Sequence, residues 1–231
     1  MLILAIDTTS PSGSVALLRD LELLRQVSRT DDAPYSSRLF QDVDQALREA
    51  GAAMAEVELF AVATGPGSFT SVRVGLAAVK AWAEVYRRPI AAVSALEAMA
   101  AQASPDEVLV AGISDAHRGQ LFAGLYERNA AVLRRRGEDV VMAPAECFAY
   151  LAKQAGGSPF VIRTTAPGAV NALVEGSAAA RPRVEAADLA LASSIGSLGY
   201  SRSQRGELTD ALHLDAHYVR RSDAELLWRG R

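Results

Sequence analysis

The feature that most constrains the fold is a pattern that occurs twice, about one hundred residues apart. In each copy an apolar run ends in an aspartate, and a short turn leads to a second apolar run. The first copy comprises residues 2–6, Asp7 and residues 15–18, and the second comprises residues 108–113, Asp115 and residues 121–126. A buried strand followed by a return strand explains each copy. The spacing is too long for a solenoid, so we predict a duplicated α/β fold with two lobes facing a cleft.

Hydrophobic periodicity and capping residues assign the other elements. In the first lobe we predict strands at 2–6, 15–18, 21–27, 59–63 and 90–93, and helices at 36–50, 69–87 and 94–103. In the second lobe we predict strands at 108–113, 121–126, 131–136 and 160–162, and helices at 145–155 and 186–202. Ser104-Pro105-Asp106 marks a boundary, so we expect lobes at 1–104 and 105–231, with a last segment that could cross back to the first lobe.

The most distinctive local sequence runs from Thr64 to Gly75 and reads TGPGSFTSVRVG, between a predicted strand and a long helix. Ser68 is placed to cap that helix, whose free N–H groups suit an anion. A close-packed partner helix and a plain capped turn explain the same residues equally well. The stretch is not a P-loop, because no lysine precedes Lys80, and it is not a dinucleotide fingerprint, because Thr70 stands where a third glycine is needed.

Composition and charge exclude several classes of protein. Half of the 231 residues are hydrophobic, as in a globular protein, and no apolar run is long enough to span a membrane. The formal net charge of −3 provides no overall basic field for nucleic acid, and we expect the basic run at 134–136 to lie in a solvated hairpin. Cys147 is the only cysteine and the first residues lack the basic region of a secretory signal, so a disulfide framework is excluded and a cytoplasmic location is expected.

Two aspartates at predicted strand ends are candidates for chemistry. Asp7 is followed by Thr8 and Thr9, and such a hairpin, with Ser14 on its return strand, could hold Mg²⁺-bound water and the phosphates of a nucleotide. The alternative is that these side chains only satisfy N–H groups of the turn. Asp115 has a similar alternative, since Arg118 is close enough in sequence to pair with it.

His213 and His217 are candidate metal ligands because they are four residues apart. The surrounding sequence is typical of an extended segment, in which residues four apart lie about 13 Å from each other, too far to share an ion. We therefore expect both histidines to be structural. We also expect Cys147 to be a small buried hydrophobic residue.

Several segments together resemble the bacterial TsaB (YeaZ) family over essentially the whole chain. The resemblance rests on the hairpin sequence at 3–9 and 13–17, GPGSFTSVRVG at 65–75, DAHRG at 115–119 and YVR at 218–220. It implies the actin-like/Hsp70-like ATPase fold, which is ribonuclease H-like and has the duplicated two-lobe architecture.

The resemblance implies a dimerisation subunit and not a catalyst. TsaB-like chains pair with a catalytic TsaD-like paralogue, and a TsaE-like ATPase joins them to attach threonylcarbamoyl to N6 of adenosine 37 in tRNAs that read codons beginning with A. By this resemblance tRNA is bound through the complex, and ATP and Mg²⁺ act at the level of the complex. The chain itself is expected to bind no cofactor or metal and to have no membrane partner. Its partner surface could also support a homodimer when the partner is absent, and the sequence leaves homodimer and monomer open.

The partner surface implied by the family is formed by the first-lobe helices that begin near Ser36 and Phe69. The residues assigned to it are Gly65, Pro66, Gly67, Ser68, Phe69, Thr70, Val72, Arg73, Gly75, Leu76, Val79, Leu39 and Val43. This chain departs from the family at Ser71, where glycine is usual, and at Tyr35, where histidine is frequent. The HxxxH metal helix of the catalytic paralogue has no counterpart in the first helix of this chain.

An active small-molecule kinase or ATPase of the same fold is the alternative hypothesis. It requires a catalytic base in the cleft and an adenosine pocket in the second lobe. Neither can be placed in the sequence, and the weakly patterned region from Ser158 to Ala187 argues against the pocket.

Overall fold

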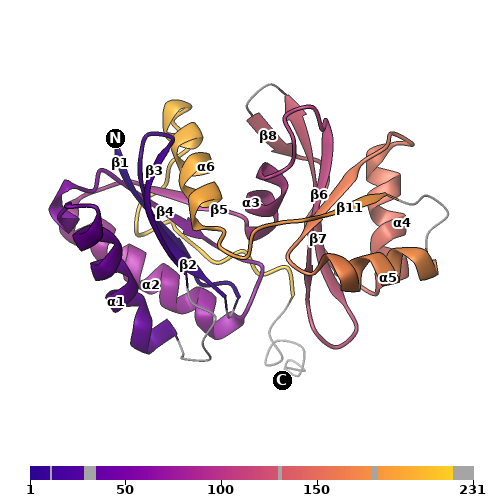
Figure 1. Cartoon of the computed structure of the whole chain (residues 1–231), viewed down its shortest axis with the longest axis horizontal. Coiled ribbons are helices and arrows are strands. Elements are labelled where there is room, and N and C mark those ends of the chain that lie inside the picture. Colours follow the sequence, from indigo (N-terminus) through magenta and orange to yellow (C-terminus); the bar gives the residue numbers. More distant parts are fainter. Residues whose placement is uncertain (11, 29–34, 130–131, 178–181, 221–231) are drawn as a thin grey trace, which may run out of the picture.

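The computed structural model describes residues 1–231 except 11, 29–34, 130–131, 178–181 and 221–231. Two lobes lie side by side, each built on one β-sheet (Figure 1). Helices cover both faces of each sheet, which produces five layers. In order, these layers are α1 (Tyr35–Glu49) with α2 (Phe69–Tyr86), the first sheet, α6 (Ala192–Gln204) with α3 (Ala95–Ala101), the second sheet, and α4 (Pro144–Ala155) with α5 (Pro167–Ser177).

The first sheet has five strands with β1 at its centre. Its spatial order is β3 (Glu22–Ser28), β2 (Ser14–Arg19), β1 (Leu2–Asp7), β4 (Leu59–Ala63) and β5 (Ile90–Val93). β1 is antiparallel to β2, with Asp7 opposite Ser14, and parallel to β4. Every residue of β1 is buried, because helices cover both faces, and this explains its continuous apolar sequence.

The second sheet repeats this arrangement around β6. Its spatial order is β11 (Arg183–Ala186), β10 (Val161–Thr164), β6 (Leu109–Asp115), β7 (Leu121–Asn129) and β8 (Val132–Arg135), with β9 (Val140–Met142) paired to β7 off this path. β6 is antiparallel to its hairpin partner β7 and parallel to β10, as β1 is to β2 and β4. The predicted duplicated α/β fold with two lobes is therefore confirmed.

The two lobes share the apolar core that lies between the sheets. This core includes Ile3 from the first sheet, Ile195 from α6, Leu96 from α3 and Tyr126 from the second sheet. After β11 the chain returns to the first lobe, where α6 packs on β1, β2, β4 and β5. A shared core fixes the lobes against each other, since opening them would expose apolar surface to water.

Most predicted elements are present, with boundaries shifted by a few residues. The prediction of a helix at 186–202 is wrong at its start, because β11 ends at Ala186 and α6 begins at Ala192. Helix α5 and strands β9 and β11 were not predicted; α5 contains two glycines and β11 is half polar, so neither has clear periodicity. Residue 131, the predicted start of a strand, lies outside the described residues. Among the helices that the structure describes, none is long and apolar enough to cross a membrane.

Candidate functional site

A cleft of about 830 Å³ lies between the two lobes. Its first-lobe wall is formed by Thr9 and Ser10 after β1 and by the glycine loop, residues 64–68, after β4. Its second-lobe wall includes the hairpin tip, residues 115–119, which follows β6. All of these segments lie at the carboxyl ends of central strands, where open α/β sheets bind ligands.

The glycine loop is packed onto the turn that follows β1. The Ser68 N–H donates to the Thr9 carbonyl oxygen at 2.9 Å. Gly67 is required by this packing, because a Cβ atom there would lie 2.3 Å from the same oxygen. Ser68 occupies the predicted N-cap of α2 and its side chain accepts from Ser71 N at 3.5 Å. Part of the loop's donor capacity is thus already used within the protein.

Asp7 does not face the cleft. The carboxylate is fully buried, and its Oδ1 accepts from Thr9 N at 2.8 Å and from Thr9 Oγ1 at 2.7 Å. Burial raises the pKa of Asp7 above its ordinary value, and the two hydrogen bonds from Thr9 oppose this shift. Asp7 Oδ2 and the hydroxyl of Thr8, which is also fully buried, have no hydrogen-bond partner among the described residues.

Three of the four residues of the predicted nucleotide site lie away from the lining of the cleft. Asp7 and Thr8 are covered by protein, and Ser14 Oγ accepts from Ala192 N at 2.9 Å, at the start of α6. The Ser14 hydroxyl therefore accepts from a helix terminus in the other half of the chain. Thr9 alone of the four lines the cleft.

The hairpin tip presents polar side chains to the cleft from the second lobe. Asp115 accepts from His117 N at 2.7 Å, and its other carboxylate oxygen lies 3.3 Å from His117 Nδ1. His117 and Arg118 both have positive φ angles, 57° and 56°. Such angles are uncommon for residues other than glycine, so the tip has a specific, strained backbone.

A segment near the C-terminus, residues 214–220, crosses from one wall of the cleft to the other, and we call it the strap. In the first lobe His217 N donates to Thr64 O at 2.8 Å, and the Tyr218 hydroxyl accepts from Arg73 Nε at 2.9 Å. In the second lobe Arg220 donates to Ala116 O at 2.8 Å and to Gln120 Oε1 at 2.6 Å. Sequence patterns did not predict this bridge, because its contacts join residues about one hundred positions apart.

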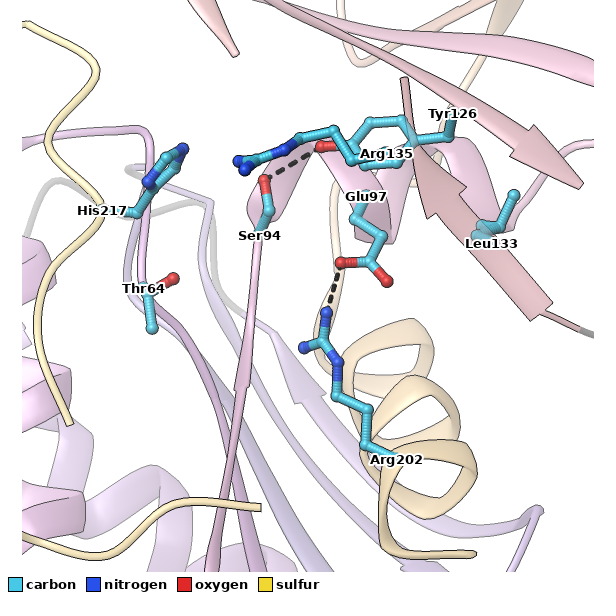
Figure 2. Close-up of a pocket in the computed structure, with 8 residues that line it drawn as sticks. All are labelled: Thr64, Ser94, Glu97, Tyr126, Leu133, Arg135, Arg202 and His217. Atoms are coloured by element: carbon cyan, nitrogen blue, oxygen red, sulfur yellow. Dashed lines mark hydrogen bonds and ion pairs between the residues drawn. The ribbon is translucent and has the colours of Figure 1, made fainter. Parts of the chain in front are cut away.

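Asp139 lies at the centre of a polar network behind the strap. Its buried carboxylate lies 2.9 Å from His217 Nε2 and accepts from the Tyr126 hydroxyl at 3.2 Å and from Ser94 Oγ at 3.4 Å. Figure 2 shows His217, Ser94 and Tyr126 converging on one polar region between the lobes. Ser94 is the N-cap residue of α3, but its side chain makes no cap hydrogen bond. Arg134 and Arg135 of the basic run are exposed on β8, which pairs with β7 as a hairpin, whereas Asp139 beyond the run is buried.

Ser94, Tyr126 and His217 also line a second cavity of about 370 Å³. This cavity shares Thr64 and His217 with the cleft. Glu97 and Arg202 form an ion pair at its edge, with 2.6 Å between Oε2 and the guanidinium (Figure 2). Burial raises the pKa of Glu97, and the charge of Arg202 opposes this shift. Both groups are thus already paired within the protein.

The aliphatic members of the predicted partner surface are buried within the chain itself. The members that lie in the core between α1, α2 and the first sheet are Leu39, Val43, Val72, Leu76 and Val79. Gly75 also faces inward, because a Cβ atom there would lie 2.5 Å from Thr8 Oγ1. The members that retain exposure are Gly67, Ser68, Phe69, Thr70 and Arg73. Helical periodicity identified the apolar stripe, but a stripe of this kind covers its own sheet before it can serve a partner.

The exposed face of α1 and α2 carries a different apolar set. Phe40 and Val85 are 60% and 73% exposed. Trp82, on α2, is partly exposed. Its ring centroid lies 5.6 Å from that of Phe40 and 6.1 Å from that of Phe60. The side chain of Tyr35, at the start of α1, lies outside the described residues. We call Phe40, Trp82 and Val85 the α1–α2 patch.

The candidate metal ligands have separate hydrogen-bond partners. His213 Nδ1 lies 2.8 Å from Asp210 Oδ1, whereas His217 contacts Asp139. No group of three or more potential ligands is close enough to hold a metal ion among the residues that the structure describes. Cys147 is fully buried as expected, and burial raises the pKa of its thiol to about 12.

Comparison with known proteins shows the family to which the chain belongs. The family model described as "TsaD: tRNA N6-adenosine threonylcarbamoyltransferase" matches residues 30–162, which is more than half of the chain. The Bacillus subtilis protein named tRNA threonylcarbamoyladenosine biosynthesis protein TsaB is 36% identical over 135 residues. That match covers 58% of this chain and 59% of the relative, so the chain aligns with somewhat more than half of the relative's length.

Solved structures extend the likeness to nearly the whole chain. YeaZ from Pseudomonas aeruginosa has a TM-score of 0.78 and 27% identity, covering 94% of this chain and 99% of that one. The ROK hexokinase from Thermus thermophilus has a TM-score of 0.53 at 13% identity, covering 88% of this chain and 100% of that one, which shows a shared fold alone. Both are consistent with the actin-like ATPase fold. The chain belongs to the family described by the TsaD model, as a member of its TsaB (YeaZ) branch.

Proposed function

We propose that this chain is a non-catalytic subunit of a complex that adds threonylcarbamoyl to N6 of adenosine 37 in tRNAs that read codons beginning with A. In this proposal it dimerises with a TsaD-like catalytic paralogue, a TsaE-like ATPase joins the pair, and the assembly works in the cytoplasm. The names of the Bacillus subtilis and Escherichia coli relatives, which refer to tRNA threonylcarbamoyladenosine biosynthesis, support this role.

The observation that carries the proposal is the α1–α2 patch. Phe40 and Val85 are 60% and 73% exposed on α1 and α2, and the Phe40 ring lies 5.6 Å from that of the partly exposed Trp82. Exposed apolar patches mark binding surfaces, and aromatic residues are enriched at binding hot spots. We place the partner interface there, together with the exposed part of the glycine loop. The same patch would support a homodimer when the partner is absent, because two copies could cover each other's apolar surface.

The test is binding of single-charge variants to the TsaD-like partner. Val85→Glu should weaken binding by at least about tenfold in calorimetric titration, because the carboxylate would be buried in an apolar contact. Val108→Glu is the matched control, since Val108 is 59% exposed in the second lobe. It should bind as the unmodified chain does. Equal affinity of both variants would place the interface elsewhere.

The non-catalytic role is supported by the cleft, which does not fit a magnesium nucleotide well. Because Asp7 is buried, Asp115 is the one carboxylate among the described residues that line the cleft. The Ser14 hydroxyl already accepts a hydrogen bond from the start of α6. We expect the isolated chain to hydrolyse ATP no faster than buffer, with Asp7→Asn unchanged. Turnover of about 1 s⁻¹ that is lost in Asp7→Asn would favour the kinase or ATPase alternative.

A further inference from the structure

The charged groups that line the cleft are already engaged within the chain. His117 Nδ1 lies 3.3 Å from the Asp115 carboxylate, and His217 contacts a buried carboxylate at 2.9 Å. Arg220 donates to acceptors of the hairpin, and Arg118 has an interaction of its own. An ionic ligand would have to compete with these contacts while losing its own hydration. The apolar lining therefore decides what the cleft can bind.

Apolar side chains from both lobes make up most of that lining. Met99 and Leu191 are 2% and 3% exposed, whereas Phe69 and Leu189 retain 38% and 50% exposure. The other apolar lining residues are Pro66, Val72, Ala95, Ala116, Phe122 and Val219. A cleft of about 830 Å³ has room for several large side chains, and concave, mostly apolar surfaces of this size are typical binding sites for apolar groups.

The chain itself supplies such groups directly after the strap. Val219 packs on the shared core, and the Arg220 guanidinium lies 5.6 Å from the ring centroid of Phe122, so the strap ends inside the cleft wall. Residues 221–231 lie outside the described part of the chain and read RSDAELLWRGR. Their large apolar residues are consecutive, and we call Leu226-Leu227-Trp228 the LLW segment. The remaining residues of this stretch are small or charged, so burial of the LLW segment alone would remove its apolar surface from water.

The LLW segment is within reach of the cleft. Leu226 and Trp228 are six and eight residues beyond Arg220. An extended chain of these lengths spans up to about 20 and 26 Å. Attachment at the cleft wall also makes docking an intramolecular event, with an effective concentration of order 1 mM, so a weak intrinsic affinity is enough.

We propose that the LLW segment docks in the cleft of its own chain, with its three apolar side chains against the apolar lining. The cleft is then occupied by the protein itself. The α1–α2 patch is also apolar, but it is an exposed helix face and not a concavity next to Arg220. The inference does not depend on the proposed function, whose partner interface lies on that patch.

Tryptophan fluorescence tests the docking in the full chain. The sequence contains two tryptophans, so Trp82→Phe leaves Trp228 as the single reporter. In this background we expect emission at a shorter wavelength, and acrylamide quenching severalfold weaker, than in the same chain unfolded in urea. Both differences should be independent of protein concentration, because the segment and the cleft belong to one molecule.

A charge on the exposed part of the cleft lining should release the segment. In the Trp82→Phe background, Leu189→Glu should weaken docking by at least about tenfold, because a carboxylate would be buried against apolar side chains. Emission and quenching should then approach those of the unfolded reference. Val108→Glu is the matched control, since Val108 is 59% exposed and does not line the cleft, and it should leave both readouts unchanged.

Two further variants locate the docking site. Val85→Glu, on the α1–α2 patch, should leave Trp228 protected. Leu226→Ser combined with Leu227→Ser should expose Trp228 without changing any residue of the described lobes. Thermal melts of every variant check that the lobes remain folded.

Four outcomes would overturn the inference. Trp228 could be quenched as strongly in the folded chain as in urea, which would show that the segment is in solvent. Equal protection in Leu189→Glu, or release by Val85→Glu, would place the segment outside the cleft. Protection that falls on dilution would assign it to the cleft of another copy. None of these outcomes alters binding to the TsaD-like partner, which is titrated separately, so the proposed function stands or falls on its own test.

Discussion

Gly75 provides the sharpest test of how α2 packs on the first sheet. It lies in the interior of α2, and a Cβ atom there would be 2.5 Å from Thr8 Oγ1 and 3.3 Å from Thr8 Cγ2. In an open helix position, Gly→Ala stabilises by about 1 kcal/mol through helix propensity. Here the methyl group must displace a buried β-branched side chain, and overpacking costs about 1–3 kcal/mol. We therefore expect Gly75→Ala to be between neutral and about 2 kcal/mol destabilising.

A double-mutant cycle separates these two contributions. Thr8→Ala removes both atoms that crowd position 75, so Gly75→Ala in that background should stabilise by about 1 kcal/mol. Ala77→Gly, at an exposed position of the same helix, measures the propensity contribution alone and should cost about 1 kcal/mol. Urea or thermal unfolding gives all four free energies, and for a chain of this size 1 kcal/mol corresponds to about 2–4 °C in Tm.

The cycle can refute the packing described here. If Gly75→Ala stabilises equally in both backgrounds, the position is open and a partner helix could approach it. Partner affinity adds a second readout: because Gly75 faces Thr8, the folded Gly75→Ala variant should bind the TsaD-like partner as tightly as the unmodified chain.

Three further predictions concern buried polar groups. Burial raises the pKa of Asp7, so its carboxyl favours folding most below about pH 4, and this contribution is lost as the pH rises through the raised value. In a series of thermal melts, the Tm of Asp7→Asn relative to the unmodified chain should therefore rise between about pH 4 and 7. A difference in Tm that does not change with pH would contradict the burial of Asp7. Ser14→Ala should cost about 0.5–2 kcal/mol in urea unfolding by removing the acceptor at the start of α6, and an unchanged unfolding free energy would mean that Ala192 N finds another acceptor. Asp139→Ala should cost about 1–3 kcal/mol because it leaves buried donors without an acceptor, and should raise hydrogen exchange in the strap; unchanged exchange there would show that the His217 contact does not hold it.

The sequence by itself determined the duplicated architecture. The apolar runs that end in Asp7 and Asp115 recur because each lobe has a central strand buried on both faces. Such a strand needs consecutive apolar residues, so it can be recognised from the local sequence. The helix after the glycine loop and its cap at Ser68 are likewise local, since capping depends on residues within one turn. Helix α5 has no such signal, and its existence became visible only in the fold.

The tertiary structure alone decided what the polar residues do. Asp7, Ser14 and Asp139 each have a side chain suited to binding a ligand, yet each is engaged or buried by contacts within the chain. A pattern of residue types cannot distinguish these uses, because the partner of Ser14 is 178 residues away and that of Asp139 is 78 residues away. The same limit applies to α1 and α2, where periodicity identifies an apolar stripe and only the packed sheet shows that this stripe faces inward and leaves Phe40 and Val85 in solvent.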